Sequence, residues 1–445
     1  MKRSNLKPAI SALLLGSLLI TGCKARITGE GIAYAEPMRT DEELTVFVTS
    51  DIHYLAPSLI DGGPAFRRYT SGGDGKNLVH IDRITEAFKD EVLENAPDVL
   101  IVSGDLTNNG EKESHLALAQ IFREMEAGGT SVYVTPGNHD VNNPHARGFS
   151  GDRQFVAETV TPEEFSQIYS EFGFQEAELL DESSLSYLAK PSEDTWILMV
   201  DTNKYVRNKE LGYPEAGGIL SLKTHQFIRA ALAEAKEAGA EVITVSHHNA
   251  LIHSEIAVED YVLDNHEEYL NNIRRSGVRL NLTGHIHIQD IQVNRDKEPF
   301  YEIASNALSV YPHKYGVIQV YAEDELEYMS RKVDLTQIMA GSSARDFVSL
   351  DAWSRSYFMR NSTSRIRTRL LEESSAEPAD IDIMAEAIGE LNVLYFGGDE
   401  SLMNEEMLAH EGFRLMKESG DERTRYYMER IFQEKGSDDN YLHLP

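Results

Sequence analysis

Polar side chains that can bind metal ions or transfer protons recur along this chain, each after a short apolar segment. They form five groups: Asp51/His53, Asp105, Asn138/His139, His247 and His285/His287. Carboxylate, imidazole and amide groups supply oxygen and nitrogen ligands without thiolate, a set that suits Mn, Fe, Zn or Ni. One such group is weak evidence, because Asp, Asn and Gly are also common in turns. The chemistry therefore depends on whether the fold brings the five groups together.

Each group follows a segment that predicts a buried strand. These segments, rich in β-branched and apolar residues, are 44–49, 98–102, 131–135, 241–245 and 278–282, and a further strand is predicted at 195–200. Helical periodicity at 80–94, 116–125, 222–238 and 267–275 then predicts parallel β-α-β units. Open α/β sheets bind ligands at the carboxyl ends of such strands, which is where the polar groups fall.

The order of these groups, D-x-H, G-D, G-N-H-D, H and G-H-x-H, resembles the calcineurin-like metallophosphoesterases over residues 44–322. The resemblance implies an α/β fold in which two β-sheets form a sandwich flanked by helices. It also implies that one metal ion is bound by Asp51, His53, Asp105 and His287. A second metal ion would be bound by Asp105, Asn138, His247 and His285.

Phosphate-ester hydrolysis explains why such ligands are needed. Two metal ions roughly 3.5–4 Å apart supply a bridging hydroxide as nucleophile and stabilise the anionic transition state. Two cations this close need a shared carboxylate, for which Asp105 is the candidate. We expect Mn or Fe, with Zn as an alternative. His139 is placed to protonate the leaving oxygen as general acid, with Asp140 favouring its charged form; alternatively, His139 only hydrogen-bonds the loop.

The pattern leaves open the roles of three further residues, His248, Asn108 and Asp201. His247 is expected to be the ligand rather than His248, because adjacent strand residues face opposite ways; the proline that usually follows in the family is absent. Asn108 and His248 are candidates for substrate contact, although a turn explains Asn108 equally well. Asp201 follows another strand and either orients a ligand from behind or simply ends the strand.

The stretch Gly218-Ile219-Leu220, with Gln226, resembles the bacterial class III cyclic-nucleotide phosphodiesterases. That resemblance implies a phosphodiesterase acting on cyclic nucleotides or similar small phosphate esters. The alternatives are a phosphomonoesterase or nucleotidase at the cell surface, and a lipoprotein that binds a phosphorylated ligand without catalysis. The formal net charge of −31 argues against a nucleic-acid-binding surface.

The N-terminal sequence is typical of an exported protein, and we do not expect it to belong to the folded domain. Lys2, Arg3 and Lys7 precede the apolar run 12–20, and Ile20-Thr21-Gly22-Cys23 resembles the lipobox of bacterial lipoproteins. This implies a signal peptide at 1–22, diacylglycerol on Cys23, a tether at 23–41, and a location at the extracellular face of the bacterial membrane. The alternative is an ordinary secretory signal. Cys23 is the sole cysteine, so no disulfide can form within the chain.

After a catalytic domain at 42–325, residues 326–445 predict a helical C-terminal domain, with helices at 351–371, 379–391 and 401–433. The first helix holds five arginines and no acid between residues 352 and 371: Arg355, Arg360, Arg365, Arg367 and Arg369. They either reach a substrate phosphate or pair with acidic neighbours, and pairing is the simpler interpretation. Segments 288–293, 300–303 and 316–321 predict a second, partly antiparallel sheet, and 57–77 a long loop.

Overall fold

Strands and helices alternate up to residue 320, and the chain is mainly helical after residue 350. The computed structural model describes residues 43–72, 75–295, 299–321, 325–340 and 348–445. The expected signal peptide (1–22) and tether (23–41) lie outside the described residues. Within the described ranges, no helix has both the length and the apolar character needed to cross a membrane.

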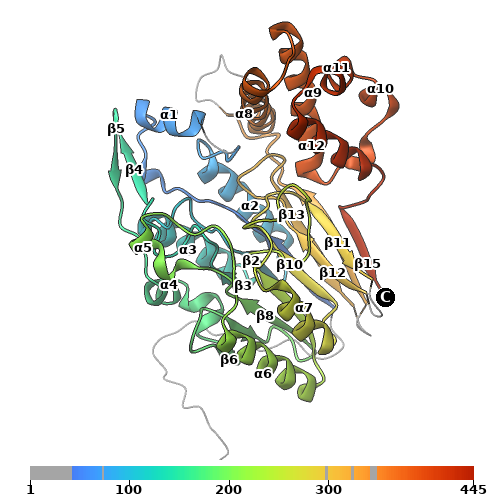
Figure 1. Ribbon diagram of the computed structural model, residues 1–445. Coiled ribbons are helices and arrows are strands. Elements are labelled where there is room, and N and C mark those ends of the chain that lie inside the picture. The colour runs from blue at the N-terminus through green and yellow to red at the C-terminus, as the bar shows by residue number, and fades with distance from the viewer. Residues whose placement is uncertain (1–42, 73–74, 296–298, 322–324, 341–347) are drawn as a thin grey trace, which may run out of the picture. The chain divides into compact units, whose positions relative to one another are not determined.

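The strands form two main sheets (Figure 1). The β1 sheet has the order β15-β14-β13-β1-β2-β3, and the β9 sheet has the order β11-β12-β10-β9-β8-β7-β6. The strands of the β1 sheet are β1 (Leu44–Thr49), β2 (Val99–Ser103), β3 (Ser131–Thr135), β13 (Lys314–Val320), β14 (Leu326–Lys332) and β15 (Tyr441–Leu444). Those of the β9 sheet are β6 (Leu179–Leu180), β7 (Tyr187–Ala189), β8 (Thr195–Val200), β9 (Glu241–Ser246), β10 (Leu280–Thr283), β11 (Asp290–Asn294) and β12 (Phe300–Ala304). In the β1 sheet, β1, β2 and β3 run parallel, and β13, β14 and β15 are added, each antiparallel to the strand before it. In the β9 sheet, β8, β9, β10 and β12 run parallel, and β11, β7 and β6 each pair antiparallel with their neighbours.

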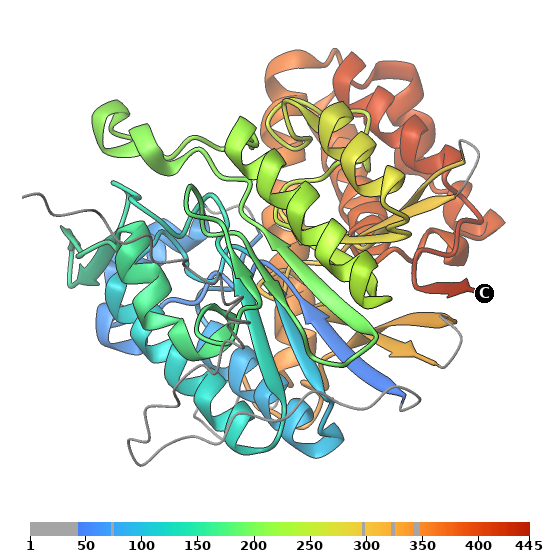
Figure 2. The ribbon, with the colours of Figure 1, turned by 90° about the horizontal axis from the view of Figure 1, so that it is seen from below.

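Alternate residues of a strand pack on opposite faces of its sheet, because side chains along a strand repeat every second residue. Val46 and Val48 of β1 share a core with Ile197 of β8, so this core lies between the two sheets. Phe47 faces the other way, into the core under α2 and α3, and Leu198 of β8 faces the core under α6 and α7. The covering helices are α2 (Ile81–Asn95), α3 (Lys112–Ala127), α6 (Leu222–Ala238) and α7 (His266–Arg275). Figures 1 and 2 show the two pairs of helices on opposite flanks of the sandwich.

The predicted α/β sandwich with flanking helices is confirmed, but its sheets are composed differently from the prediction. Segments 288–293 and 300–303 extend the β9 sheet, because β12 runs parallel beside β10. Segment 316–321 instead joins the β1 sheet, where β13 pairs antiparallel with β1. The predicted loop at 57–77 contains α1 (Pro64–Ser71), which buries Ala65 and Phe66. These differences come from long-range pairing and packing, which local sequence patterns do not encode.

The C-terminal region begins and ends in the β1 sheet. The predicted boundary after residue 325 separates β13 from β14, which are paired neighbours, and β15 pairs with β14 after the helices. The predicted helix at 401–433 is divided into a 3₁₀ turn at Glu400–Leu402, α10 (Glu405–Leu408), α11 (Glu411–Ser419) and α12 (Glu422–Gln433). Side chains of Asn404, His410 and Asp421 cap the starts of α10, α11 and α12, and such caps begin a new helix.

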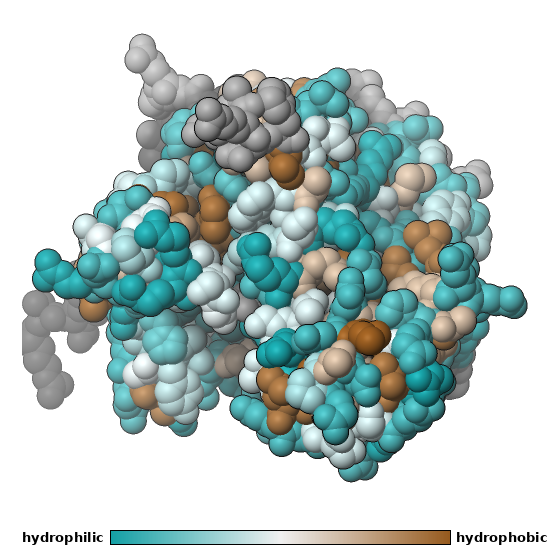
Figure 3. Space-filling model, turned by 90° about the horizontal axis from the view of Figure 1, so that it is seen from above, coloured by the Kyte–Doolittle hydropathy of each residue, from teal (hydrophilic) through white to brown (hydrophobic). Residues whose placement is uncertain are grey.

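The C-terminal helices pack on the catalytic sandwich through their own apolar core. Residues of α8 (Leu350–Glu373), α9 (Pro378–Gly397), α11 and α12 share that core with Ile286 and Ile288, which follow β10. Lys314 of β13 adds a polar contact by donating to the carbonyl of Gly397 and to Asp399. On the face seen in Figure 3, mostly hydrophilic residues are exposed, with hydrophobic ones in small groups.

An acidic cluster is buried where the C-terminal region meets the β9 sheet. Glu400 is 2% exposed, and burial, together with the nearby charges of Asp439, Asp290 and Glu434, raises its pKa to about 9. His253 partly neutralises the cluster through a 2.5 Å contact with Asp290. Although burial favours neutral imidazole, this contact and the one to Glu302 raise the pKa of His253 to about 9.

We predict that Glu400→Gln stabilises the protein increasingly as pH rises from about 5 to about 9. Below pH 9 folded Glu400 keeps a proton that the unfolded chain releases above its ordinary pKa of 4.5, so wild-type stability falls across this interval. The amide removes that cost, which is on the order of 5 kcal/mol at pH 8. Thermal unfolding should therefore show a higher midpoint for the variant at pH 8 and nearly equal midpoints near pH 5. The exposed neighbour Glu406 gives the control Glu406→Gln; the same response in both variants would contradict the prediction.

Candidate metal centre

The polar groups singled out from the sequence meet at one edge of the sandwich. Asp51 and His53 follow β1, Asp105 follows β2, Asn138 follows β3, His247 follows β9, and His285 and His287 follow β10. Backbone hydrogen bonds hold these strand ends together: the N–H of His53 donates to the carbonyl of Asp105 (2.9 Å), and that of Gly284 donates to the carbonyl of His247 (3.1 Å). Strand ends of both sheets thus contribute side chains to one place.

The backbone turns sharply at most of these positions. Asp51, His53, Asp105, His285 and His287 all have positive φ, between 46° and 68°. A non-glycine residue in this left-handed region costs of order 1–3 kcal/mol, so the surrounding structure must hold it there. The turns direct residues that leave parallel strands toward a common centre.

Two glycines of the motifs permit close packing around the acids. A Cβ on Gly284 would lie 1.7 Å from Ser50 Oγ and 2.5 Å from Asp51 Oδ2. A Cβ on Gly137 would lie 2.2 Å from both the backbone nitrogen and Oδ1 of Asp105. Any larger residue would displace Asp51 or Asp105, which explains the glycine that precedes His285 and the one that precedes Asn138.

The side chains form two groups that share Asp105. In the first, ligand atoms of Asp51, His53, Asp105 and His287 all lie within 4.8 Å of one another; in the second, those of Asp105, His247 and His285 do so. Asp105 Oδ2 is 3.6 Å from His53 Nε2 and 3.5 Å from His247 Nε2, so one carboxylate oxygen faces both groups. Asn138 adds an amide oxygen 3.1 Å from His247 Nε2.

The donor atoms suit bound cations. Asp51 Oδ1 is buried without a hydrogen-bond partner among the described residues, although it lies 3.2 Å from His287 Nε2. Burial lowers the pKa of His53 and, with His247, lowers that of His285 to about 3, which leaves both rings neutral with a free lone pair. Burial opposes ionisation of Asp105, but the charges of His247 and His139 hold its pKa well below the ordinary value. Anionic carboxylates and neutral imidazoles are the forms that bind metal ions.

Neighbouring groups orient the donors. Asp51 Oδ2 accepts hydrogen bonds from the hydroxyl of Ser50 (2.5 Å) and the backbone N–H of His285 (2.9 Å). His247 Nδ1 contacts the carbonyl of Ser103 (2.9 Å), which leaves Nε2 to face Asp105. His285 Nε2 contacts the carbonyl of Asp260 (3.0 Å), which leaves Nδ1 for the site. Such contacts fix the tautomer of a metal-binding imidazole.

That Asp140 favours the charged form of His139 stays a prediction, and the structure shows where the carboxylate of Asp140 is held. Its carboxylate accepts hydrogen bonds from the backbone N–H groups of Leu106, Thr107 and Gly137. Asp140 thereby fixes the backbone beside Asp105. His139 Nδ1 contacts the carbonyl of Asn108 (2.8 Å) and Oδ1 of Asn109 (3.1 Å). The His139 side chain is 24% exposed, and its Nε2 lies 4.0 Å from Asp105 Oδ2.

The less determined residues occupy supporting positions. His248 is fully buried and uses both ring nitrogens, at 2.7 Å from Thr202 Oγ1 and 2.8 Å from the carbonyl of Ala216, so this geometry favours His247 as the donor facing Asp105. The buried Asn108 donates to the hydroxyl of Tyr69, which holds its side chain within the loop. The expected contact of His248 and Asn108 with a substrate stays a prediction.

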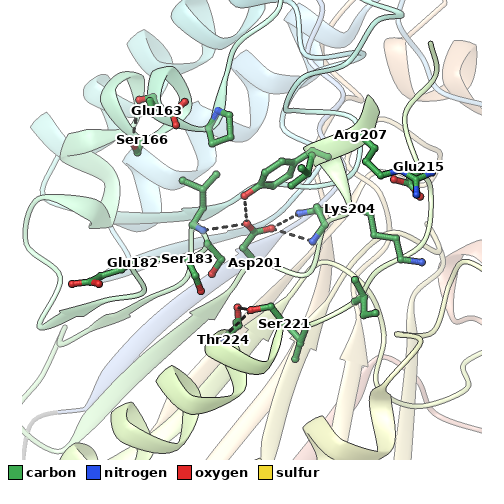
Figure 4. A pocket seen from close by; sticks show the side chains of 18 residues that line it. Glu163, Ser166, Glu182, Ser183, Asp201, Lys204, Arg207, Glu215, Ser221 and Thr224 are labelled. Atoms are coloured by element: carbon green, nitrogen blue, oxygen red, sulfur yellow. Dashed lines mark hydrogen bonds between the residues drawn. The ribbon is translucent and has the colours of Figure 1, made fainter. Parts of the chain in front are cut away.

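Asp201 contributes to a different cavity, of about 780 Å³, whose lining contains none of the seven candidate ligands. Figure 4 shows its carboxylate above Ser221, which caps α6, and Thr224 of α6. It accepts hydrogen bonds from Tyr205 (2.7 Å) and from the backbone N–H groups of Leu185 and Asn203. Asp201 therefore stabilises the loops after β8 and does not contact a candidate ligand.

Comparisons with known proteins agree with this fold and site. The family model for the calcineurin-like phosphoesterases matches residues 44–289, more than half of the chain, and the chain belongs to that family. Beyond the catalytic region, the family model for the C-terminal domain of cyclic nucleotide phosphodiesterase matches residues 340–438. The resemblance inferred from the motifs is therefore confirmed, and the His/Asp cluster is compatible with a dinuclear metal site.

Solved structures provide similar but distant folds. A dimetal phosphatase from Danio rerio shares 14% identity and a TM-score of 0.47, with 65% of this chain and 96% of that chain covered. GAP50, the anchor in the inner membrane complex of Plasmodium, shares 10% identity and a TM-score of 0.36, covering 66% and 85%. TT1561 of Thermus thermophilus shares 9% identity and a TM-score of 0.34, covering 66% and 100%. No curated protein sequence matched the chain significantly.

Several supporting residues were missed by the sequence reasoning. Ser50 and Asn109 contact Asp51 and His139, and both lie beside motif residues, so proximity in sequence was the available signal. The ring of Tyr261 lies 5.1 Å from that of His285. It comes from a loop that carries no recognisable motif, so no local signal pointed to it.

Proposed function

We propose that this chain is a dinuclear metal-dependent phosphodiesterase for small phosphodiesters of cyclic-nucleotide type. One observation carries the proposal: two His/Asp groups meet at a single oxygen, Asp105 Oδ2. A shared carboxylate is what two neighbouring cations require. The match of residues 340–438 to the C-terminal domain of cyclic nucleotide phosphodiesterase supports diesters over monoesters.

In this proposal the first cation is held by Asp51, His53, Asp105 and His287, and the second by Asp105, Asn138, His247 and His285. Mixed nitrogen and oxygen donors without thiolate favour Mn or Fe, with Zn as the alternative. Two bound cations would supply a nucleophile at neutral pH and offset the negative charge of the phosphoryl group. The half-buried His285 and His287 mark the side from which a substrate phosphate can approach.

His139 acts as the general acid in the proposed mechanism. The carbonyl of Asn108 accepts a hydrogen bond from Nδ1–H of His139, so the second proton of the charged imidazolium is on Nε2, which faces the site. That nitrogen lies beside Asp105 without being part of either ligand group. It can therefore donate its proton to the leaving oxygen as the phosphorus–oxygen bond breaks. Asp140 supports this step by fixing the loop on which His139 is mounted.

The proposal also places the enzyme on the outer face of a bacterial membrane, through a lipid on Cys23. Its support is the sequence Ile20-Thr21-Gly22-Cys23 after a basic and then apolar stretch. A small phosphate ester is the expected partner, and the formal charge of −31 makes binding to nucleic acid unfavourable.

The proposed function first predicts the class of substrate. The chain from Lys24 onward, reloaded with Mn, should hydrolyse bis-p-nitrophenyl phosphate and 2′,3′-cyclic AMP faster than p-nitrophenyl phosphate. Asp105→Asn keeps the side-chain shape but removes the shared charge, so it should lose metal and more than about a hundredfold of the activity. Steady-state rates and metal content measure both effects. Faster hydrolysis of the monoester would indicate a phosphatase or nucleotidase instead. If none of the three substrates is hydrolysed although two metals are bound, the chain would be a protein that binds a phosphorylated ligand without catalysis.

We further predict that His139→Ala retains both metals but loses turnover selectively. A poor leaving group such as a ribose hydroxyl needs a proton donor, whereas p-nitrophenolate leaves without one. Hydrolysis of 2′,3′-cyclic AMP should fall by about a hundredfold, with a much smaller loss on bis-p-nitrophenyl phosphate. Equal losses on both substrates, at unchanged metal content, would show that His139 is not the acid.

The lipid anchor gives a separate prediction. In a bacterial host, the full chain should incorporate labelled palmitate and partition into detergent, and Cys23→Ser should abolish the labelling. Because Cys23 is the only thiol, no other cysteine can take the acyl chain. Labelling that persists in the variant would refute the anchor while leaving the proposed activity untouched.

A further inference from the structure

A second cavity lies beside the metal centre, between the catalytic sandwich and the C-terminal helices. It has a volume of about 480 Å³ and is lined by residues of the loop 256–261 and of α8, α9 and α12. Tyr261 lines it, and the ring of Tyr261 packs 5.1 Å from the ring of His285. The lining also includes Gly75. Tyr261 therefore separates the cavity from His285 of the proposed active site by a single ring.

The lining is strongly basic in a chain that is strongly acidic. Arg365 and Arg369 of α8 and Arg423 of α12 contribute to it, and no carboxylate is found among its described lining residues. Elsewhere on α8, Arg355 pairs with Glu390 and Arg367 with Asp382. Neither Arg369 nor Arg423 forms an ion pair within the described part of the chain. Of the arginines on α8, Arg355 and Arg367 are thus paired with acids as the simpler interpretation expects, whereas Arg369 has no ion pair among the described residues.

A buried donor points to a ligand independently of the arginines. Asn361 lines the cavity and is 7% exposed, yet its Nδ2 has no hydrogen-bond partner among the described residues. The neighbouring Asn392 is fully used, because it donates to Ser362 and accepts from Tyr427 (both 2.7 Å). Burying an amide N–H group without a hydrogen-bond acceptor costs free energy, and a ligand that supplies an acceptor removes this cost. An anionic oxygen would be such an acceptor.

Helical spacing places these donors in one row. Asn361, Arg365 and Arg369 are four residues apart on α8, so they lie on one face of the helix. Arg367 lies outside the row and pairs with Asp382 (2.7 Å). Phe358 and Phe396 add aromatic surface to the same lining. Guanidinium groups bind phosphate strongly, and flat aromatic rings suit a nucleobase.

We propose that this cavity binds a second phosphate group of the substrate, so that the enzyme prefers nucleotide phosphodiesters that carry an additional phosphate. The inference rests on the proposed phosphodiesterase function and narrows its substrate class. A simple cyclic nucleotide has one phosphate and would occupy only the metal centre. A 5′-phosphorylated dinucleotide can place its diester at the metal centre and its terminal phosphate among Arg365, Arg369 and Arg423. The size of the cavity is within the usual range for small-molecule sites.

The reaction on such a substrate balances with water alone. In 5′-phosphoadenylyl-(3′→5′)-adenosine, an oxygen from water joins the bridging phosphorus and the bond from phosphorus to the 3′ oxygen breaks. The 3′ oxygen takes a proton, which His139 is placed to donate, and two molecules of 5′-AMP result. The leaving nucleotide is then the one whose 5′-phosphate is held by the arginines.

The test compares this dinucleotide with adenylyl-(3′→5′)-adenosine, which lacks the terminal phosphate. We expect wild type to show at least a tenfold higher kcat/KM for the phosphorylated compound, mainly through KM. Arg369→Ala and Arg423→Ala should each reduce that ratio by about tenfold. The matched control is Arg367→Ala, which removes an exposed, paired arginine of the same helix and should keep the wild-type ratio. A wild-type ratio near one, or the same ratio in all four proteins, would overturn the inference.

A binding measurement keeps this inference separate from the proposed function. Adenosine 3′,5′-bisphosphate is titrated calorimetrically into the Mn-loaded chain, with no turnover required. We expect Arg369→Ala and Arg423→Ala to weaken its binding by about tenfold, and Arg367→Ala to leave the Kd unchanged. If neither dinucleotide is hydrolysed but this pattern holds, the anion site stands and its role in substrate choice fails, while the phosphodiesterase proposal is decided by the rates on 2′,3′-cyclic AMP and bis-p-nitrophenyl phosphate. Equal affinity in every variant would remove the anion site whatever the activity.

Discussion

In the proposed dinuclear centre, Asp105 lies between the two cations, where their mutual repulsion would otherwise be greatest. Its Oδ2 faces His53 from the β1 sheet and His247 from the β9 sheet, and its Oδ1 accepts the backbone N–H of His139 (2.8 Å). Any arrangement that holds two cations close together needs negative charge between them. That requirement explains why the strand ends of both sheets converge, why the backbone adopts positive φ at Asp51, His53 and Asp105, and why glycine is needed at position 137. Much of the local structure serves to hold one carboxylate in position.

Asp140 shows how a buried charge can support a site without entering it. Burial and the charge of Asp105 raise its pKa to about 7, while backbone N–H donors act in the opposite direction. Those donors belong to the turn that carries Asp105 and to Gly137. The carboxylate therefore joins the loop after β2 to the loop after β3. The link between these two loops fixes the position of His139, and it is a more rigid support than a single hydrogen bond to the His139 ring.

The sequence allowed the strands of the catalytic core to be predicted closely, because β1, β3 and β8 are short apolar runs ended by polar turns. The convergence of the metal-binding groups followed from the rule that parallel strands end at one edge. Sheet membership of β12 and β13 could not be predicted, since it depends on pairing between residues far apart in the chain. The orientation of Asp140 escaped prediction because the pattern specifies residue types and not the loop backbone. The basic row on α8 was visible, but which arginines lack acidic partners depends on how α9 and α12 pack.

Because β15 pairs with β14, the C-terminal helices are inserted between two neighbouring strands at the edge of the β1 sheet. They are not connected to it by a single linker. The helices follow β14 and precede β15, which pairs with β14. Both ends of the helical segment are therefore held by backbone hydrogen bonds within the β1 sheet. Domains joined by one flexible linker reorient freely unless a large interface holds them, whereas this double attachment leaves little room for rotation. The arginines of α8 and α12 are consequently presented to the metal centre at a constant distance. Binding energy that a hinged protein would use to close its domains is available here for discrimination between ligands.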